Sequence, residues 1–316
     1  LFRSPIRLAV TSLRRVSAGD SRLSEIVDVL ETESRRLEVM ARSFAPTEQQ
    51  YGTRDTLLYA LGLGLGADPM DARELRFVYE DGLQALPTQA VTLCWAPTST
   101  LGLGIDLLRA VHGDHSLVLH RPLATAGTLV GHTRIASLVD LGAEKGALLR
   151  IERRLHDKAT GEAVATSTMG LFCRGDGGFG GPAQPRPVPH ALPTRACDQQ
   201  VARATLPQQA LLYRLSGDVN PLHADPAFAA RAGFPRPILH GLVTYGIAAH
   251  ALVHAVCGND AAGLREIHGR FTSPVFPGET LRTEIWDEGG GHVALRVRVV
   301  ERDRRVFDNG QAVVAR

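Results

Sequence analysis

The sequence is poor in cysteine, lysine and aromatic residues, and it carries almost no net charge. Its four cysteines form no Cys-x-x-Cys pair, which argues against a disulfide framework and a zinc site and suits a reducing compartment. Lysine occurs twice, at Lys145 and Lys158, so arginine supplies nearly all the positive charge. A net charge of +2 and 5% aromatic residues leave no footprint for binding nucleic acid.

Two common catalytic motifs are also missing. No Gly-x-Gly-x-x-Gly follows an expected strand, so a dinucleotide site is unsupported. The twelve histidines include no His-Glu-x-x-His, so a zinc protease is unsupported as well.

One long segment lacks charged residues altogether. Residues 238–257 contain no Asp, Glu, Lys or Arg, and this uncharged segment is long enough to span a bilayer. The segment holds three histidines and no basic cluster flanks it, and polar groups are costly in lipid. We therefore predict a buried helix wrapped by a sheet, and no membrane association. Pro237 suits the first position of this helix, where its missing N–H costs nothing.

The two ends of the chain bear on localisation. Residues 1–19 hold four arginines and no acid, as a mitochondrial transit peptide does, although the first residue is not Met. We expect residues 1–46 to form an extension that is helical or poorly ordered. The chain ends Val-Ala-Arg, without the peroxisomal Ser-Lys-Leu signal, so the expected compartment is the cytoplasm, with the mitochondrion as the alternative.

The rest of the chain divides into two similar halves, residues 47–174 and 201–316. Residues 175–200 between them begin with a run rich in Gly and Pro, which predicts a linker. In each half, helical patterns precede strand-like runs separated by turn residues. The expected helical stretches are 53–64, 102–111 and 208–215, and the expected strands are 115–120, 128–139, 147–155, 163–173, 266–271, 280–287, 292–301 and 305–314.

A short sequence match supports a duplication. Both Pro122–Leu129 and Pro274–Leu281 read Pro-x5-Thr-Leu, and both precede a long expected strand. We predict an α+β double hot-dog fold, in which two antiparallel sheets each wrap around a central helix.

The segment 213–223, YRLSGDVNPLH, places Asp218, Asn220 and His223 within six residues. These residues can simply shape a loop, because Gly-Asp and Asn-Pro are turn formers and an Asp side chain can accept backbone N–H groups. The alternative is chemistry. Gly241 lies near the start of the apolar helix, where free N–H groups and the helix dipole could polarise a carbonyl, beside an acid and an imidazole that handle protons.

The whole stretch 213–246, YRLSGDVNPLHADPAFAARAGFPRPILHGLVTYG, closely resembles the signature of the type 2, (R)-specific enoyl-CoA hydratases of the MaoC-like hot-dog superfamily. The core pattern SGDxNPLHxDxxxAxxxGFxxPILHG is met at every specified position. In the first half, YALGLGLG, LRFVYE, LPT, VHGD and GGFGG are similar to the hydratase 2 domain of peroxisomal multifunctional enzymes. The resemblance covers the chain from about residue 51 onward.

This resemblance implies the reversible hydration of a trans-2-enoyl-CoA to an (R)-3-hydroxyacyl-CoA, with no cofactor and no metal. Asp218 and His223 match the catalytic pair, and which of them is the base stays open. The Gly241 N–H would bind the thioester oxygen. Substrate-binding residues would be His112, Gly113, Asn220 and Phe271. For His112 alone, a histidine at a helix C-terminus facing the dipole is an equal alternative.

Several expectations follow from the same resemblance. Only the second half carries the catalytic cluster, so the first half would accommodate a bulky acyl chain. Where the family often has Asp-Lys-Gly, this chain reads Asp140-Leu-Gly, so a basic contact to CoA would be lost unless Lys145 replaces it. The partners would be an acyl-CoA and a second copy of the chain in a homodimer. The alternatives are an acyl-CoA thioesterase and a non-catalytic acyl-CoA-binding subunit.

Overall fold

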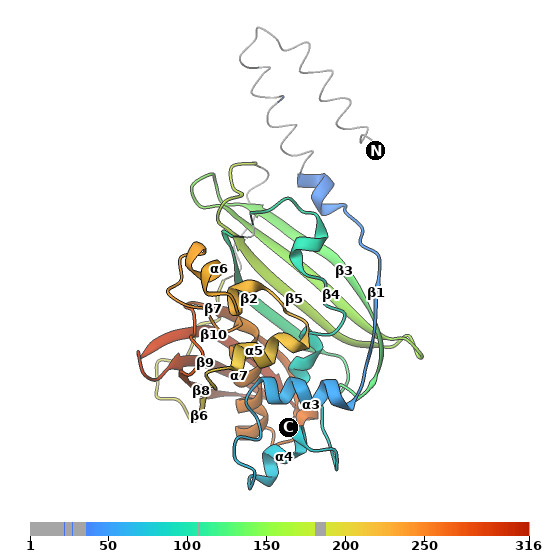
Figure 1. The fold of residues 1–316 in the computed structure, drawn as a ribbon, viewed down its shortest axis with the longest axis vertical. Helices are drawn as coiled ribbons and strands as arrows, with labels where there is room; N and C mark the ends of the chain where they lie inside the picture. The colour runs from blue at the N-terminus through green and yellow to red at the C-terminus, as the bar shows by residue number, and fades with distance from the viewer. Residues whose placement is uncertain (1–21, 23–26, 28–35, 107, 181–187, 316) are drawn as a thin grey trace.

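The computed structural model describes the chain except for residues 1–21, 23–26, 28–35, 107, 181–187 and 316. Ten strands form one antiparallel sheet in the order β1-β3-β4-β5-β2-β7-β10-β9-β8-β6 (Figure 1). The strands are β1 Thr47–Tyr51, β2 Ala110–Leu119, β3 Gly127–Asp140, β4 Ala147–Asp157, β5 Ala163–Cys173, β6 Gln199–Ala204, β7 Leu264–Phe271, β8 Thr280–Gly289, β9 His292–Val299 and β10 Arg304–Val314.

The sheet is duplicated internally. The first five strands lie in the order 1-3-4-5-2, and the last five repeat that order as 6-8-9-10-7. The two halves join where β2 pairs with β7, and Ser116 pairs there with His268. These two residues are as far apart in sequence as Thr128 and Thr280, the threonines of the two Pro-x5-Thr-Leu matches, which lie at the starts of β3 and β8. A pseudo-twofold axis therefore passes between Ser116 and His268, and the predicted double hot-dog fold is confirmed.

The apolar segment forms the helix α7, Gly241–Ala255, which packs against all five strands of the second half. Its residues from Leu242 to Val253 are all buried, as expected for a helix that is apolar on every side. None of the helices within the described ranges has both the length and the apolar character that crossing a membrane requires.

The first half departs from the prediction of a central helix in each half. In place of a counterpart to α7, the described residues form a five-residue 3-10 helix, η1 Pro87–Val91, which contacts α7. Pro87 begins this turn, and the chain leaves it at Thr92 toward a loop that passes over the sheet. The helix α3, Thr53–Gly62, lies where one was expected, and α4, Ala72–Val78, follows it.

Two local predictions were wrong. The described residues of the segment 102–111 are not helical, because Gly102 and Gly104 have positive φ angles of 60° and 71°, and the segment enters β2 at Ala110. Pro237 does not begin α7, because the chain stays extended through His240, and the N–H of Leu239 donates to Val275 O at 2.7 Å. Most of the N-terminal extension expected over residues 1–46 lies outside the described residues. The predicted domain and linker boundaries stay predictions.

Most of the remaining helical segments lie in residues 209–231, on either side of Asp218. They are α5 Gln209–Tyr213, η3 Arg214–Ser216, η4 Pro221–His223 and α6 Pro226–Arg231, with η2 Thr98–Leu101 in the first half and η5 Ala261–Gly263 before β7. The α5 and η3 segments confirm the helix expected over residues 208–215. Both α5 and η3 pack against α3 of the first half.

We predict that Gly269→Ala destabilises the protein by about 1–3 kcal/mol, because the added methyl overpacks the core. A Cβ at Gly269 would lie 2.2 Å from Cζ of the fully buried Phe307 ring. Urea unfolding measures this change. Gly52→Ala is the control, since a Cβ there meets no atom within 4 Å and φ is −129°. Equal free energies of unfolding for the two variants would contradict the packing argument.

Candidate active site

Asp218 lies in a tight loop between η3 and η4. Gly217 turns the chain into this loop with φ of 121°, a conformation that other residues rarely adopt. The Asp218 carboxylate accepts the N–H of Asn220 at 3.2 Å, as in an Asx turn. The loop-shaping role considered from the sequence is therefore real, and one carboxylate oxygen serves it.

Asn220 caps the short helix η4. Its side-chain oxygen accepts the N–H of Leu222 at 3.0 Å, and the residue is exposed. Its contribution in the structure is to fix the loop that carries the acid and the imidazole. Its predicted contact with substrate stays a prediction.

His223 is held in one orientation and one tautomer. Its Nδ1 lies 2.8 Å from the carbonyl oxygen of Ile238, and because a carbonyl can only accept, Nδ1 carries the hydrogen. The other ring nitrogen, Nε2, therefore has a free lone pair when the ring is neutral. The residue is 8% exposed, so this lone pair belongs to a mostly desolvated base.

His240, which the sequence argument did not select, stacks on His223. The two ring centroids are 3.7 Å apart and the planes differ by 27°. His240 Nε2 donates to the backbone oxygen of Asp218 at 3.1 Å, and its Nδ1 is buried without a hydrogen-bond partner in the described part of the chain. The available signal was its position in the PILHG motif, immediately before Gly241.

Burial keeps both imidazoles neutral near physiological pH. It lowers the pKa of His223, while the nearby charge of Asp218 acts in the opposite direction and raises it. The pKa of His240 falls well below its ordinary value, chiefly through burial and then through the charge of His223. The pair is therefore suited to accept protons rather than to carry a permanent charge.

Asp218, His223 and His240 also offer atoms within 4.8 Å of one another, close enough to consider a shared metal ion. The two imidazoles are stacked nearly in parallel, so their lone pairs do not readily converge on one ion. The carboxylate and the His223 lone pair suit a water molecule and its proton better.

The start of α7 lies beside these histidines. Gly241 is the first residue of the helix, so its N–H has no acceptor inside the helix and can bind an oxygen. A Cβ at this position would lie 3.2 Å from the Phe271 ring, so glycine allows that ring to pack closely against the helix start. The predicted Gly241 and Phe271 are thus brought together.

His112 and Gly113 reach the same place across the joint between the two halves. Gly113 is the extra residue of a bulge in β2, because pairing with β5 jumps from His112 to Asp114 at that point. The His112 ring lies 4.7 Å from the Phe271 ring, between centroids. His112 belongs to a strand, so its reading as a helix-terminal histidine is wrong.

A line of polar contacts continues from His112 into the first half. Its Nε2 lies 3.1 Å from Nδ1 of His115, whose Nε2 lies 3.0 Å from the hydroxyl of Ser167. Burial lowers the pKa of His112 to about 4 and holds the pKa of His115 well below its ordinary value. These rings are consequently neutral hydrogen-bonding groups.

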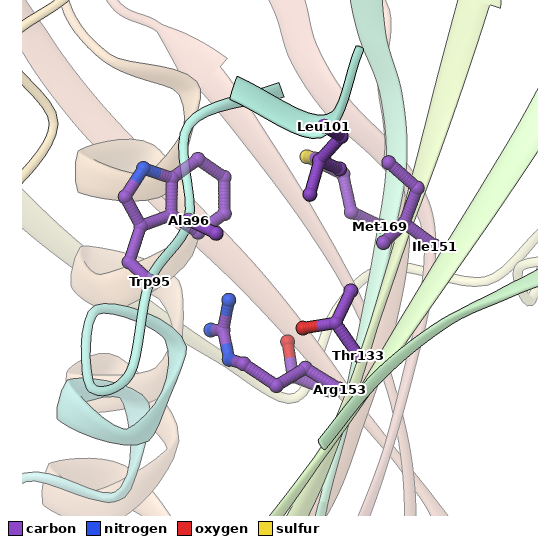
Figure 2. Close-up of a pocket in the computed structure, with 8 residues that line it drawn as sticks. Trp95, Ala96, Leu101, Thr133, Ile151, Arg153 and Met169 are labelled. Carbon is purple, nitrogen blue, oxygen red and sulfur yellow. The ribbon is translucent and has the colours of Figure 1, made fainter. Parts of the chain in front are cut away.

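Ser167 also lines a small pocket with room for about one water molecule (Figure 2). The pocket lies between the strands β3, β4 and β5 and the loop that follows η1. Trp95, Leu101, Ile151 and Met169 supply its apolar walls. It occupies the half in which a long central helix is missing.

Lys145, considered as a substitute CoA contact, lies exposed in the turn between β3 and β4. Asp140, at the end of β3, accepts the N–H groups of Gly142 and Gly178, each at 2.8 Å. The aspartate therefore anchors the GGFGG segment. A contact between Lys145 and CoA stays a prediction.

Comparisons with known proteins agree with this architecture. A family model described as the MFE-2 hydratase 2 N-terminal domain matches residues 49–175, and one described as a MaoC like domain matches residues 190–309. The chain is 40% identical to the peroxisomal enoyl-CoA hydratase 2 of Arabidopsis thaliana, over 85% of this chain and 92% of that protein. It is 43% identical to the 3-hydroxyacyl-thioester dehydratase Y of Mycobacterium tuberculosis, over 83% and 92%. The crystal structure of a MaoC-like dehydratase from Phytophthora capsici superposes with a TM-score of 0.79 at 35% identity, covering 88% of this chain and 98% of that one.

Buried histidines predict a pH-dependent stability. His115, His240 and His250 are at most 3% exposed, and burial lowers the pKa of His250 to about 3. Below the unfolded-state pKa of about 6.5, the unfolded chain binds more protons than the folded one. The free energy of unfolding therefore decreases as the pH decreases.

The expected slope is up to about 1.4 kcal/mol per pH unit for each such histidine between about pH 6.5 and 5. Chemical unfolding at a series of pH values measures it. In His250→Phe the slope of the unfolding free energy against pH should decrease by the contribution of one histidine. An unfolding free energy that stays constant over this range would contradict the assignment.

Proposed function

The chain belongs to the MaoC-like enoyl-CoA hydratase 2 family, and from that premise we propose that it hydrates trans-2-enoyl-CoA reversibly to (R)-3-hydroxyacyl-CoA. The observation that carries the proposal is the arrangement of Asp218 and a neutral His223 beside the N-terminus of α7. Neither residue has a counterpart in residues 50–170.

The Gly241 N–H would polarise the substrate. A hydrogen bond from this N–H to the thioester oxygen draws electrons from the conjugated double bond and makes Cβ electrophilic. The same hydrogen bond strengthens as negative charge develops on the enolate oxygen. This added stabilisation of the transition state lowers the barrier. Phe271 and His112 close the opposite side of the helix start.

The catalytic pair would act on one water molecule. His223 Nε2 removes a proton from the water as its oxygen bonds to Cβ, and the π electrons move toward the thioester oxygen. The carboxylate of Asp218 orients the water and stabilises the imidazolium, in keeping with its effect on the pKa of His223. The imidazolium then returns the proton to Cα. The reverse sequence dehydrates the product.

This assignment of His223 as the base predicts the acid limb of the pH profile. Because burial lowers its pKa, kcat/KM should stay high below pH 6.5 and fall only at more acidic pH. In Asp218→Asn the limb should shift to still lower pH, since the carboxylate no longer raises that pKa. A limb displaced to higher pH in this variant would contradict the assignment.

The reaction itself is tested by hydration of trans-2-decenoyl-CoA, followed by loss of enoyl absorbance and chiral analysis of the product. We expect the (R)-alcohol from the unaltered protein and losses of roughly 10²–10⁴-fold in Asp218→Asn and His223→Gln. Asp225→Asn is the matched control, because Asp225 is the exposed N-cap of α6.

Other outcomes identify the alternatives. Release of free CoA thiol without the alcohol would favour a thioesterase. Binding of the acyl-CoA with no turnover, unchanged in both variants, would favour a non-catalytic binding subunit. Either result would contradict the hydratase proposal.

The remaining parts of the proposal concern the setting of the enzyme. We propose a cofactor-free and metal-free homodimer in the cytoplasm, and a first half that holds the acyl chain. Four free cysteines are compatible with a reducing compartment. Light scattering should give twice the monomer mass of 34.0 kDa.

A further inference from the structure

His240 has no part in the proton transfers proposed above, yet it adjoins every group that would act on the substrate. It stacks on His223 with 3.7 Å between the ring centroids, and its Nε2–H donates to the backbone oxygen of Asp218 at 3.1 Å. It also immediately precedes Gly241 in the chain. One side chain therefore links the base, the loop of the acid and the start of the helix.

The two ring nitrogens of His240 have different surroundings. Nε2 carries the hydrogen, because the backbone oxygen of Asp218 can only accept, so Nδ1 bears the lone pair of the neutral ring. This Nδ1 is buried without a partner in the part of the chain that the structure describes, and the residue is 1% exposed. A buried acceptor without a partner costs stability. If His240 served packing alone, an apolar ring would fill the same space without that cost.

His240 also differs from an ordinary helix cap. It is the N-cap of α7, a position where Ser, Thr, Asp or Asn usually accepts an N–H of the first turn. The His240 side chain makes no such capping bond, and its ring is bonded to Asp218 instead. The Gly241 N–H therefore meets no competition from this side chain for a thioester oxygen.

His240 is itself held from the core. The fully buried Tyr213 ring, at the end of α5, lies 5.0 Å from the His240 ring between centroids. Tyr213 in turn packs on Tyr59 of α3, with 5.9 Å between their centroids. Because protein cores are close-packed, this series of rings leaves His240 little room to move.

The stack shields His223 from solvent. Burial is the main cause of the lowered pKa of His223, and the His240 ring covers one face of it at an interplanar angle of 27°. The lone pair of His223 Nε2 lies in the plane of its ring. A cover on the face therefore excludes solvent from the imidazole and still leaves Nε2 open to one water molecule.

We propose that His240 is a positioning residue of the hydratase site: its Nε2–H fixes the backbone at Asp218, and its ring covers one face of His223. The inference rests on the proposed hydratase function and adds a residue to its site. His240 exchanges no proton with the substrate, since Nε2 is bonded to Asp218 and Nδ1 is buried. Its loss should therefore change kcat and leave KM nearly unchanged.

Two variants separate the two contacts. His240→Phe keeps a ring over His223 but removes the N–H that holds Asp218. With the acid displaced, kcat for trans-2-decenoyl-CoA should fall roughly ten- to a hundredfold, while KM and the acid limb of the pH profile stay as they were.

His240→Gln makes the opposite change. Its side-chain amide can still donate to the Asp218 oxygen, but the ring that covers His223 is lost. Water then reaches the imidazole, so the pKa of His223 should rise toward its ordinary value of about 6.5. The acid limb of kcat/KM should move to higher pH in this variant.

The charges around the two imidazoles are the same in both variants. Apart from each other, the charged groups that act on His223 and His240 are Asp218 and Arg214, and neither is altered. Tyr213 stays neutral, because burial raises its pKa well above its ordinary value. A moved acid limb therefore reports the loss of the cover.

His250 supplies the matched controls. It lies further along α7, is likewise buried, and has an Nε2 without a partner among the described residues. Its ring packs on Phe77 and His254 instead of on the site. His250→Phe and His250→Gln should keep kcat and the acid limb of the unaltered protein.

One measurement needs no variant and decides the matter where the variants do not fold. NMR of the histidine rings in ¹⁵N-labelled protein should show His240 as the neutral Nε2–H tautomer near neutral pH. A hydrogen on Nδ1, or a charged ring, would overturn the inference.

The kinetic results distinguish this inference from the function on which it rests. No hydration by the unaltered protein would overturn the hydratase function. Unchanged kcat in both His240 variants, a loss confined to KM, or an equal fall of kcat in the His250 controls would overturn the positioning role alone. An acid limb that moves as far in His240→Phe as in His240→Gln would overturn the shielding of His223.

Discussion

The pairing of β2 with β7 is the contact on which the candidate site depends. It joins the two halves of the sheet through backbone hydrogen bonds from Asp114–Arg270 to Val118–Glu266. At one end of this joint, the bulge at Gly113 and the last residue of β7 place His112 against Phe271. That ring in turn packs on Gly241. His112 of the first half thus lies next to the helix start of the second half. The second half also supplies the acid and the imidazole.

The two halves have diverged within a common topology. Both keep the same strand order, so both satisfy the hydrogen-bonding of a five-stranded antiparallel sheet. One half retains a buried fifteen-residue helix and carries the loop with Asp218 and His223. In the other, the five-residue η1 stands in its place, and the loop beyond it leaves a pocket with a buried cation.

Much of this could be predicted from the sequence, because the informative features are local. The apolar run gave the buried helix, and the turn residues separated the strands of both halves. The spacing of Asp218 and His223, together with the motif around it, indicated the candidate residues that the structure brings close together. The matched Pro-x5-Thr-Leu segments indicated the duplication, which the identical strand orders confirm.

The rest depends on contacts between distant segments. Residues 102–111 have an apolar pattern suited to a helix, but glycines with positive φ and the pairing of β2 with both β5 and β7 override it. The role of His240 follows from stacking on His223, which spacing alone does not reveal. Alternation along β4 places Arg153 on the same face as Ile151 and Leu155, but its burial also depends on the distant loop that carries Trp95.

The most direct test of the central claim is a crystal structure of the His223→Gln variant with a bound trans-2-enoyl-CoA. The account predicts the thioester oxygen within hydrogen-bonding distance of the Gly241 N–H, Cβ facing Asp218 and residue 223, and the acyl chain directed toward the first half. A thioester bound away from the start of α7, or a chain lying on the second half alone, would contradict it.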